Sequence, residues 1–281
     1  MMLIRSIWNE CVKIILKPRT YLGLGALTLL ISVILFALKA DGSAFIGFAT
    51  ASFEQTLSFQ GTVLNGNLVG FIIMQMLIIH VPLLVALVTG DVVSGEAAAG
   101  TLRMIATKPV SRVQLLLSKF IAGGIYTFVM VSWFAFLAIV MARWLFGDGD
   151  MVVLNSDGVV ILSHTDIVWR YAGAFVVAFL ALLTVSTLSI CLSVFTDNSI
   201  GPIVATMAVV ILFTIIGTLD VRVFDNIRPL LFTTHMAAWR SFFDQPVKLA
   251  DIRESVAILG AQNIIVISIA LFAFHRKDIT T

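Results

Sequence analysis

Six long apolar runs constrain this chain more than any other feature of its sequence. A helix needs about 20 mostly apolar residues to cross the hydrocarbon core of a bilayer. The runs are Tyr21–Leu38, Leu68–Thr89, Leu115–Phe146, Tyr171–Phe195, Ile200–Leu219 and Val256–Phe274. Only 12% of the 281 residues are charged, whereas soluble domains average about 25%. The sequence therefore predicts an all-α membrane protein with six transmembrane helices, folded as one transmembrane domain over residues 1–281.

The distribution of Lys and Arg predicts which ends of the spans face the cytoplasm. Basic residues cluster before the first run, between the second and third, and after the sixth, whereas residues 40–67 and 144–169 contain none. Because cytoplasmic loops are enriched in Lys and Arg, we expect a multi-pass protein of the inner, cytoplasmic membrane with both termini in the cytoplasm. Residues 41–67 and 147–166 are expected as outer loops. Residues 220–253 carry balanced charge and are expected as a partly helical outer loop.

The first 19 residues predict a helix that lies along the membrane surface. Apolar side chains such as Ile4, Trp8 and Ile14 recur at helical spacing, and Lys13 and Lys17 fall on the other side. This amphipathic pattern is typical of interfacial helices. We expect the basic side chains to point toward lipid phosphates, and the proline that follows Lys17 to end the helix.

Four polar residues inside the predicted spans are candidates for a translocation path. They are Gln75 and His80 in the second span, and Gln262 and Asn263 in the sixth. Ionisable groups within a membrane are functional candidates, although buried polar side chains often only hydrogen-bond a neighbouring helix, and both interpretations stay open here. Pro82 is expected to loosen the second span next to His80.

Signals for catalysis or metal binding are weak. The four histidines form no H-E-x-x-H pattern and the two cysteines follow no metal spacing, so we expect no metal site. The string Gly147–Asp148–Gly149–Asp150 resembles the G-x-G-D motif of intramembrane aspartyl proteases. It falls in an expected outer loop, however, where Gly-Asp repeats are ordinary turn chemistry. We therefore expect no enzyme and no catalytic residue, and an intramembrane enzyme stays an unfavoured alternative.

The segment Gly90–Arg112 is a compact polar stretch between the second and third runs. Its Gly90-x4-Gly95 start is not followed by the Lys and Ser or Thr of a phosphate loop, and the chain contains no complete phosphate-loop motif. Asp91 or Ser94 is expected to cap a short amphipathic helix, and Glu96 is expected in the first turn of that helix. That helix is expected to end at 108–109, and Ser111 to cap the third span.

This segment also resembles the signature of type-2 ABC exporter permeases. The resemblance rests on Asp91, Glu96, Gly100–Thr101–Leu102, Lys108–Pro109–Val110–Ser111–Arg112 and Lys119, and on the six-span plan. The tail, Phe274–His275–Arg276–Lys277–Asp278–Ile279, resembles the ending common in the branch that includes permeases of copper-enzyme maturation systems. In that family, residues 90–112 correspond to the coupling helix, which sits in a groove of a separate ATPase subunit.

The resemblance implies a permease subunit of an ATP-driven ABC transporter that acts as an exporter. It further implies a permease dimer, as a homodimer, over two ABC ATPase subunits, with ATP and Mg on the ATPase and no cofactor on this chain. The implied ATPase-coupling residues are Asp91, Glu96, Gly100, Thr101, Leu102, Arg103, Lys108, Pro109 and Arg112. Membrane lipid is the other expected partner, and nucleic acid is not, because no clustered basic surface is evident. The alternative is a non-transporting scaffold or mechanotransmitting subunit driven by the same kind of ATPase.

Overall fold

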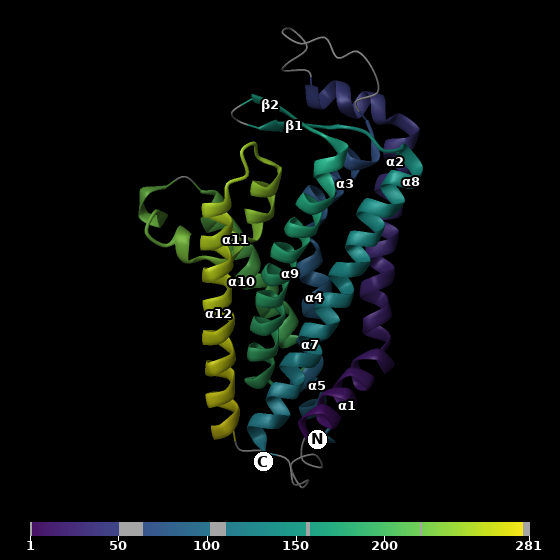
Figure 1. The fold of residues 1–281 in the computed structure, drawn as a ribbon. Helices are drawn as coiled ribbons and strands as arrows, with labels where there is room; N and C mark the ends of the chain where they lie inside the picture. Colours follow the sequence, from purple (N-terminus) through teal and green to yellow (C-terminus); the bar gives the residue numbers. More distant parts are fainter. Residues whose placement is uncertain (1, 51–63, 102–110, 156–157, 220, 278–281) are drawn as a thin grey trace.

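Long helices run side by side through the computed structural model, which describes residues 2–50, 64–101, 111–155, 158–219 and 221–277 (Figure 1). The first part of the chain forms α1 (Met2–Leu16), α2 (Pro18–Thr50), α3 (Gly66–Leu77), α4 (Val81–Thr89), α5 (Asp91–Ala98), α7 (Arg112–Ala135), the π-helical turn η1 (Phe136–Met141) and α8 (Ala142–Phe146). It continues as β1 (Met151–Asn155), β2 (Gly158–Leu162), α9 (His164–Val194), α10 (Gly201–Thr218), the 3-10 turns η2 (Arg222–Phe224) and η3 (Arg228–Leu230), α11 (Phe232–Met236), the 3-10 helix η4 (Ala237–Phe243) and α12 (Leu249–Arg276).

Six of the helical segments are long and apolar enough to cross a membrane, which confirms an all-α multi-pass membrane protein. They are Pro18–Gly42, Val81–Ala98, Arg112–Phe146, His164–Val194, Gly201–Thr218 and Leu249–Arg276. Figure 1 shows α1 and the end of α12 at one end of the bundle and the strands at the other. We call these the terminal end and the hairpin end.

The second predicted span, Leu68–Thr89, is not one helix, and this prediction was wrong in its bounds. The chain breaks between α3 and α4, where His80 N bonds to Leu77 O and Leu83 N to His80 O instead of following the α-helical ladder. Pro82 lies in the first turn of α4, where its missing N–H costs no hydrogen bond. The expected loosening of the helix near His80 is thus confirmed.

The helix expected within residues 90–112 also has other bounds. Gly90 keeps helical angles (φ −66°, ψ −23°), so α4 leads almost directly into α5, and no side chain caps α5. Glu96 is therefore near the end of α5 and not in its first turn. Gly100 has φ +69°, a conformation that favours glycine and commonly ends helices. Residues 102–110 lie outside the described part of the chain, and Ser111 caps α7 as expected by accepting a hydrogen bond from Gln114 N.

The hairpin end contains regular structure within both expected outer loops. α2 continues past a kink at Asp41 (φ −145°, ψ 43°) to Thr50, and the phenylalanines of residues 41–67 are consistent with a short helix at the start of this segment. The expected loop over residues 147–166 contains the antiparallel pair β1–β2, with Met151 opposite Leu162 and Asn155 opposite Gly158. This hairpin lies across the end of the bundle (Figure 1).

α9 is the central helix of the bundle. In its most apolar stretch 67% of residues are buried, against 17% in both α10 and α12, whose exposed apolar faces suit contact with lipid. Near the hairpin end, the rings of Phe71, Tyr171, Trp239 and Phe243 pack edge to face with centroids 5.0–6.0 Å apart. These rings join α3, α9 and η4 into one core.

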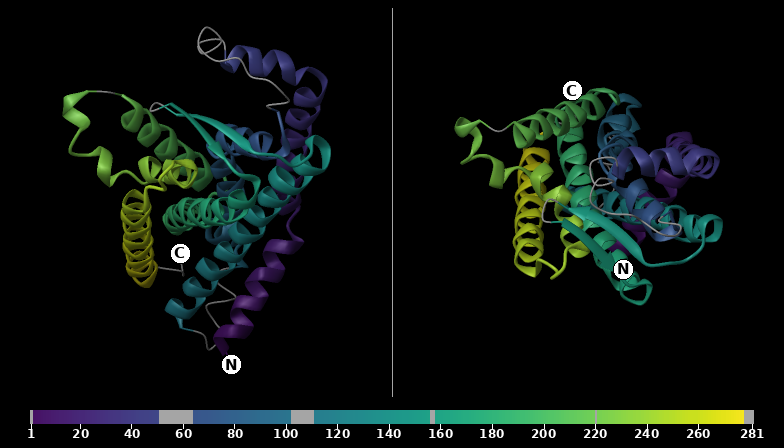
Figure 2. Two further views of the ribbon diagram at one scale, coloured as in Figure 1. Left: turned by 45° about the horizontal axis from the view of Figure 1, so that its top comes forward. Right: turned by 90° about the horizontal axis from the view of Figure 1, so that it is seen from above.

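Residues 221–248 form the partly helical loop that the sequence predicts. α11 and η4 pack against the bundle, whereas η2 and η3 extend away from it (Figure 2). Arg170 on α9 holds η4 in place, since its Nη1 donates to Phe242 O at 2.6 Å and to Asp244 O at 3.0 Å.

Candidate functional site

A buried ion cluster joins three helices at the terminal end. Lys119 on α7 is fully buried, and its Nζ lies 2.8 Å from Glu10 Oε2 on α1 and 2.7 Å from Glu96 Oε2 on α5. Lys13 Nζ lies 2.6 Å from the other oxygen, Oε1, of each carboxylate. We call Glu10, Lys13, Glu96 and Lys119 the Lys119 cluster. It carries two positive and two negative formal charges, so it is neutral as a whole.

Each charged group of the Lys119 cluster lies within 2.8 Å of a group of opposite charge. Lys119 Nζ donates hydrogen bonds to Glu10 Oε2 at 2.8 Å and to Val92 O at 3.1 Å, and it forms an ion pair with Glu96 Oε2 at 2.7 Å. Burial on its own lowers the pKa of Lys13, but the hydrogen bonds and charges of Glu10 and Glu96 outweigh it, so this pKa lies above its ordinary value. Each of the two buried carboxylates has a Lys Nζ within 2.8 Å of each of its oxygens, which offsets the cost of burying its charge.

A second set of ion pairs fixes the start of α5. Asp91 is 5% exposed, with Oδ2 2.7 Å from Lys17 Nζ and Oδ1 3.0 Å from Arg19 Nη1. Ser193 Oγ on α9 accepts hydrogen bonds from two backbone amides of α5, Val93 N and Ser94 N. The start of α5 is thus attached to both α1–α2 and the central helix.

Two of the basic residues that were expected to point toward lipid phosphates, Lys13 and Lys17, instead form ion pairs within the chain, which corrects the expectation for these two. Lys13 pairs with Glu96, and Lys17 pairs with Asp91. On the opposite side of α1, Ile4 and Trp8 are 72% and 70% exposed. Helical periodicity separates a polar from an apolar face, but it does not say whether protein or lipid covers the polar one. Here two buried carboxylates of α5 cover it.

The far end of the predicted coupling segment is attached to the last membrane helix. Arg112 Nη1 donates to His275 O at 3.0 Å and to Lys277 O at 2.7 Å, at the end of α12. Lys277 Nζ in turn donates to Val194 O and pairs with Asp197 at 2.8 Å, beyond the end of α9. A displacement of Arg112 would therefore reach α12 and the α9–α10 turn.

The predicted coupling residues thus fall into three groups. Asp91 and Glu96 are buried ion-pair partners, and Thr101 Oγ1 donates to Glu96 O at 3.2 Å beside Gly100. Arg112 bonds to the α12 tail. Leu102, Arg103, Lys108 and Pro109 lie outside the described residues.

The four residues predicted for a translocation path do not form one site within a single chain. Gln75 and His80 are exposed at the α3–α4 break, where His80 Nδ1 lies 2.8 Å from Met76 O. Asn263 is buried between helices, with Oδ1 accepting from Thr187 and Nδ2 donating to Thr184. Gln262 Nε2 donates to Leu230 O of the outer loop. The contacts of Asn263 are those of a residue that joins α9 to α12.

The Gly147–Asp150 string forms a structural loop that anchors the hairpin. Asp148 accepts a hydrogen bond from Asn67 Nδ2 at 2.8 Å, and Asp150 accepts one from His164 N at 2.8 Å. Burial slightly raises the pKa of Asp148, but the Asn67 hydrogen bond and the Arg143 charge outweigh this and hold it below its ordinary value. The hydrogen bonds from His164 lower the pKa of Asp150. The two carboxylates have separate hydrogen-bond partners, and both stabilise the conformation of this loop.

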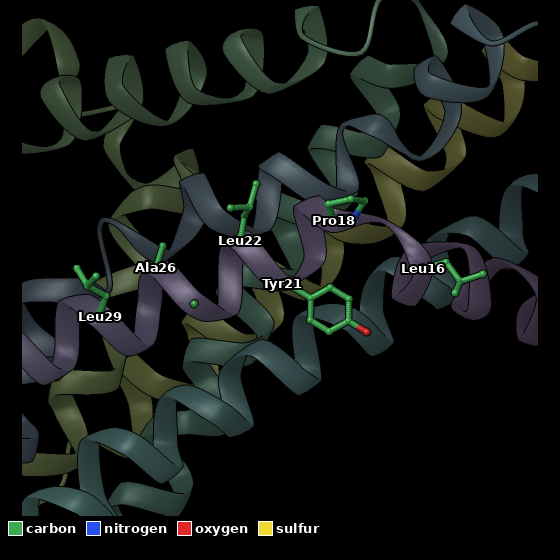
Figure 3. Close-up of a pocket in the computed structure, with 7 residues that line it drawn as sticks. Leu16, Pro18, Tyr21, Leu22, Ala26 and Leu29 are labelled. Atoms are coloured by element: carbon green, nitrogen blue, oxygen red, sulfur yellow. The ribbon is translucent and has the colours of Figure 1, made fainter.

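Two cavities differ in what they offer a ligand. A groove of about 690 Å³ along α1 and α2 has almost only apolar walls, formed by Leu16, Pro18, Tyr21, Leu22, Gly25, Ala26 and Leu29 (Figure 3). A pocket of about 320 Å³ between α4, α10, α11 and η4 has mixed walls, formed by Ile78, Ile79, Pro82, Val210, Thr214, Gly217, Thr218, Thr233, Thr234, Met236, Ala237, Trp239 and Arg240. We call the second the α10 pocket. It lies beside the α3–α4 break.

Sequence reasoning missed the partners of Glu96. Glu10 and Lys13 are three residues apart on the polar side of α1, and Lys119 is one of two cations, with Arg143, in the apolar run Leu115–Phe146. A charge embedded in a membrane span usually has a partner of opposite charge. The position of Lys119 in a predicted span therefore indicates that an acidic partner exists. Nothing in the sequence indicates that this partner is 109 positions away on α1.

Comparison with known proteins agrees with the membrane architecture. The "Probable ABC transporter permease protein NosY" of Pseudomonas aeruginosa is 35% identical over 103 residues, 37% of this chain and 35% of that protein. The protein of the same name from Stutzerimonas stutzeri is 31% identical over 121 residues, 43% of this chain and 39% of that protein. The chain thus matches less than half the length of either relative. The family described as "Protein of unknown function (DUF2705)" matches residues 25–280, and because this match covers most of the chain, the chain belongs to that family.

Proposed function

We propose that this chain is the transmembrane permease subunit of an ATP-driven ABC exporter. Two relatives that share about 40% of its length carry the name of an ABC transporter permease, and its six apolar helices suit a membrane subunit. The copper-enzyme maturation branch, to which the sequence tail is similar, fits the name of these relatives. In this proposal, ATP is hydrolysed by a separate ATPase subunit.

The observation that carries the proposal is the attachment of residues 90–112 at both of their ends. At the start, Asp91 is paired with Lys17 and Arg19 at the α1–α2 junction, and Glu96 is paired with Lys13 of α1 and Lys119 of α7. At the end, Arg112 bonds to the tail of α12. A short polar segment that is fixed to α1, α7 and α12 transmits a push or pull on its middle to three membrane-associated helices at once.

In the proposed assembly, two ATPase subunits lie under a homodimer of this chain at the terminal end, on the cytoplasmic side of the inner membrane. Closure of the ATPase dimer on ATP moves residues 99–111 of each permease. Because Asp91 and Glu96 already pair inside the chain, direct contact with the ATPase falls to the residues after Gly100. The basic side chain of Arg103 is the first charged one in that stretch.

The test is recovery of an ABC ATPase with the tagged full-length chain purified from its own cells. Wild type should retain a protein with a phosphate loop. The variant Arg103→Glu reverses one charge in the proposed contact and should lower that recovery about tenfold, which corresponds to about 1.4 kcal/mol. The matched control is Arg222→Glu, which reverses an exposed Arg at the hairpin end and should leave recovery unchanged.

Two outcomes would contradict the proposal. One is recovery of wild type from intact membranes without any ABC ATPase, and the other is equal loss of the ATPase from the two variants. Glu96 is unsuitable for this test, since a substitution there breaks the Lys119 cluster and would weaken the fold whether or not an ATPase binds.

A further inference from the structure

The α10 pocket contains polar groups that have no hydrogen-bond partner among the residues that the structure describes. Trp239 is fully buried, and its indole Nε1–H has no hydrogen-bond partner. Thr233 Oγ1 is also buried without a partner. Both residues line the pocket. Because buried donors in native proteins are almost always paired, an acceptor brought by a ligand would complete the hydrogen bonding at this place.

The pocket also holds a positive charge. Arg240 is exposed, and its Cζ lies 5.7 Å from the centroid of the Trp239 ring. It is the charged residue among the pocket walls, and within the described chain no carboxylate forms an ion pair with it. A guanidinium group binds carboxylate and phosphate oxygens with well-defined geometry, so the acceptor that fits beside Trp239 is an anion.

The remaining walls and the depth of the pocket favour a ligand with a hydrocarbon part. Ile79, Val210 and Met236 supply apolar surface. α10 starts near the terminal end, and its last turn, which includes Thr218, lines the pocket. A helix of 18 residues rises roughly 27 Å, close to the thickness of the bilayer core. The pocket therefore lies near the membrane surface at the hairpin end, where charged headgroups and apolar chains meet.

We propose that the α10 pocket binds an amphipathic anion. Its carboxylate or phosphate headgroup pairs with Arg240 and accepts the hydrogen bond from Trp239 Nε1, and its hydrocarbon chain lies against the apolar walls. A membrane lipid and a free amphiphile offer the same chemistry. This site is independent of the proposed ABC function, since binding here involves no nucleotide and no partner subunit.

The experiment uses the full chain in phosphatidylcholine nanodiscs without ATPase or nucleotide. The probe is palmitate carrying a photoreactive diazirine, compared with the matching diazirine alcohol, and labelled peptides are identified by mass spectrometry. Labelling by the anion should concentrate in residues 210–218 and 232–240 and exceed labelling by the alcohol there about tenfold, as expected for one charge-assisted contact.

Two substitutions test the headgroup contacts. Arg240→Gln removes the charge of an exposed side chain and should reduce labelling by the anion to the level of the alcohol. Trp239→Phe keeps an aromatic ring, removes the Nε1–H donor and should reduce labelling by the anion only. The matched control, Arg222→Gln, lies on η2 outside the pocket and should label like wild type. Unchanged elution on size exclusion verifies the fold of each variant.

Phosphatidylglycerol added to the nanodiscs distinguishes the source of the ligand. Competition with the palmitate probe supports an anionic membrane lipid as occupant, and absence of competition supports a free amphiphile. Equal labelling by anion and alcohol, or equal labelling of wild type and Arg240→Gln, would overturn the proposal, as would labelling spread along the lipid-facing helices. None of these results bears on whether an ABC ATPase copurifies with the chain.

Discussion

Replacement of Lys119 by Met tests how much the fold depends on the Lys119 cluster. Met is close to Lys in length and fills the buried site without a charge. The substitution leaves Glu10 and Glu96, which are 3% and 8% exposed, with Lys13 as their shared cation. The formal charge of the cluster changes from zero to minus one. Removal of one partner from a buried ion pair costs about 3–5 kcal/mol, because the other charge stays buried without compensation.

We expect the lower end of that range for Lys119→Met, about 3 kcal/mol. Lys13 contacts both carboxylates at 2.6 Å, and its side chain is 42% exposed, so it continues to compensate part of the charge. The assay is reversible unfolding in mixed micelles, titrated with a denaturing detergent and followed by Trp fluorescence. The matched control is Arg5→Met on the exposed side of α1, which should change the free energy of unfolding by no more than about 0.5 kcal/mol.

A double variant separates charge from packing. Lys119→Met with Glu96→Gln leaves one Lys and one Glu, so the cluster is neutral again. If the cost of the single substitution is electrostatic, the double variant should recover about half or more of the lost free energy. A cost below about 1 kcal/mol for Lys119→Met, or a double variant less stable than the single one, would refute the description of this cluster as a compensated ion network.

Two further predictions concern the membrane interior and the hairpin. Asn263→Leu removes the hydrogen bonds to Thr184 and Thr187 and should lower the free energy of unfolding by about 0.6–1.7 kcal/mol, the range found for bonds between membrane helices; a loss of function at unchanged stability would instead favour the translocation path. Asp148 and Asp150 have folded pKa values below the ordinary 3.8, so their anchoring of the hairpin should be complete above that value and lost as the pH falls through the lower folded values. Hydrogen exchange of residues 147–164, corrected for intrinsic rates, should show constant protection from about pH 6 to about pH 4 and falling protection below pH 3.8. Protection that stays constant below pH 3.8 would contradict this reasoning.

Local signals in the sequence predicted local structure well. Pro82 marked a break because proline lacks the N–H that an unbroken helix needs, and Ser111 marked the start of α7 because its side chain caps a free amide. The hairpin carried a readable signal that was overlooked. MVVLN and GVVIL both contain neighbouring β-branched residues, and the sequence Asn-Ser-Asp-Gly that joins them has the composition typical of a hairpin connection.

Contacts between distant parts of the chain could not be predicted in the same way. The polar face of α1 was evident from its periodicity, but either lipid phosphate or a carboxylate of another helix satisfies a Lys side chain there. The choice depends on where α5 and α7 pass, and therefore on packing over more than 80 residues of sequence. The α10 pocket likewise arises only where α4, α10 and η4 meet.

The inward pairing of Asp91 and Glu96 changes what the coupling segment offers a partner. The family resemblance implies that these acids contact an ATPase, but cations of α1, the α1–α2 junction and α7 pair with them inside the chain. The charged side chains left between Gly100 and Ser111 are Arg103 and Lys108, both basic. Complementary charge at interfaces steers association and selects partners. We therefore expect the groove of the proposed ATPase that receives this segment to be acidic, with α1 held to α5 by its own ion pairs and moving with it.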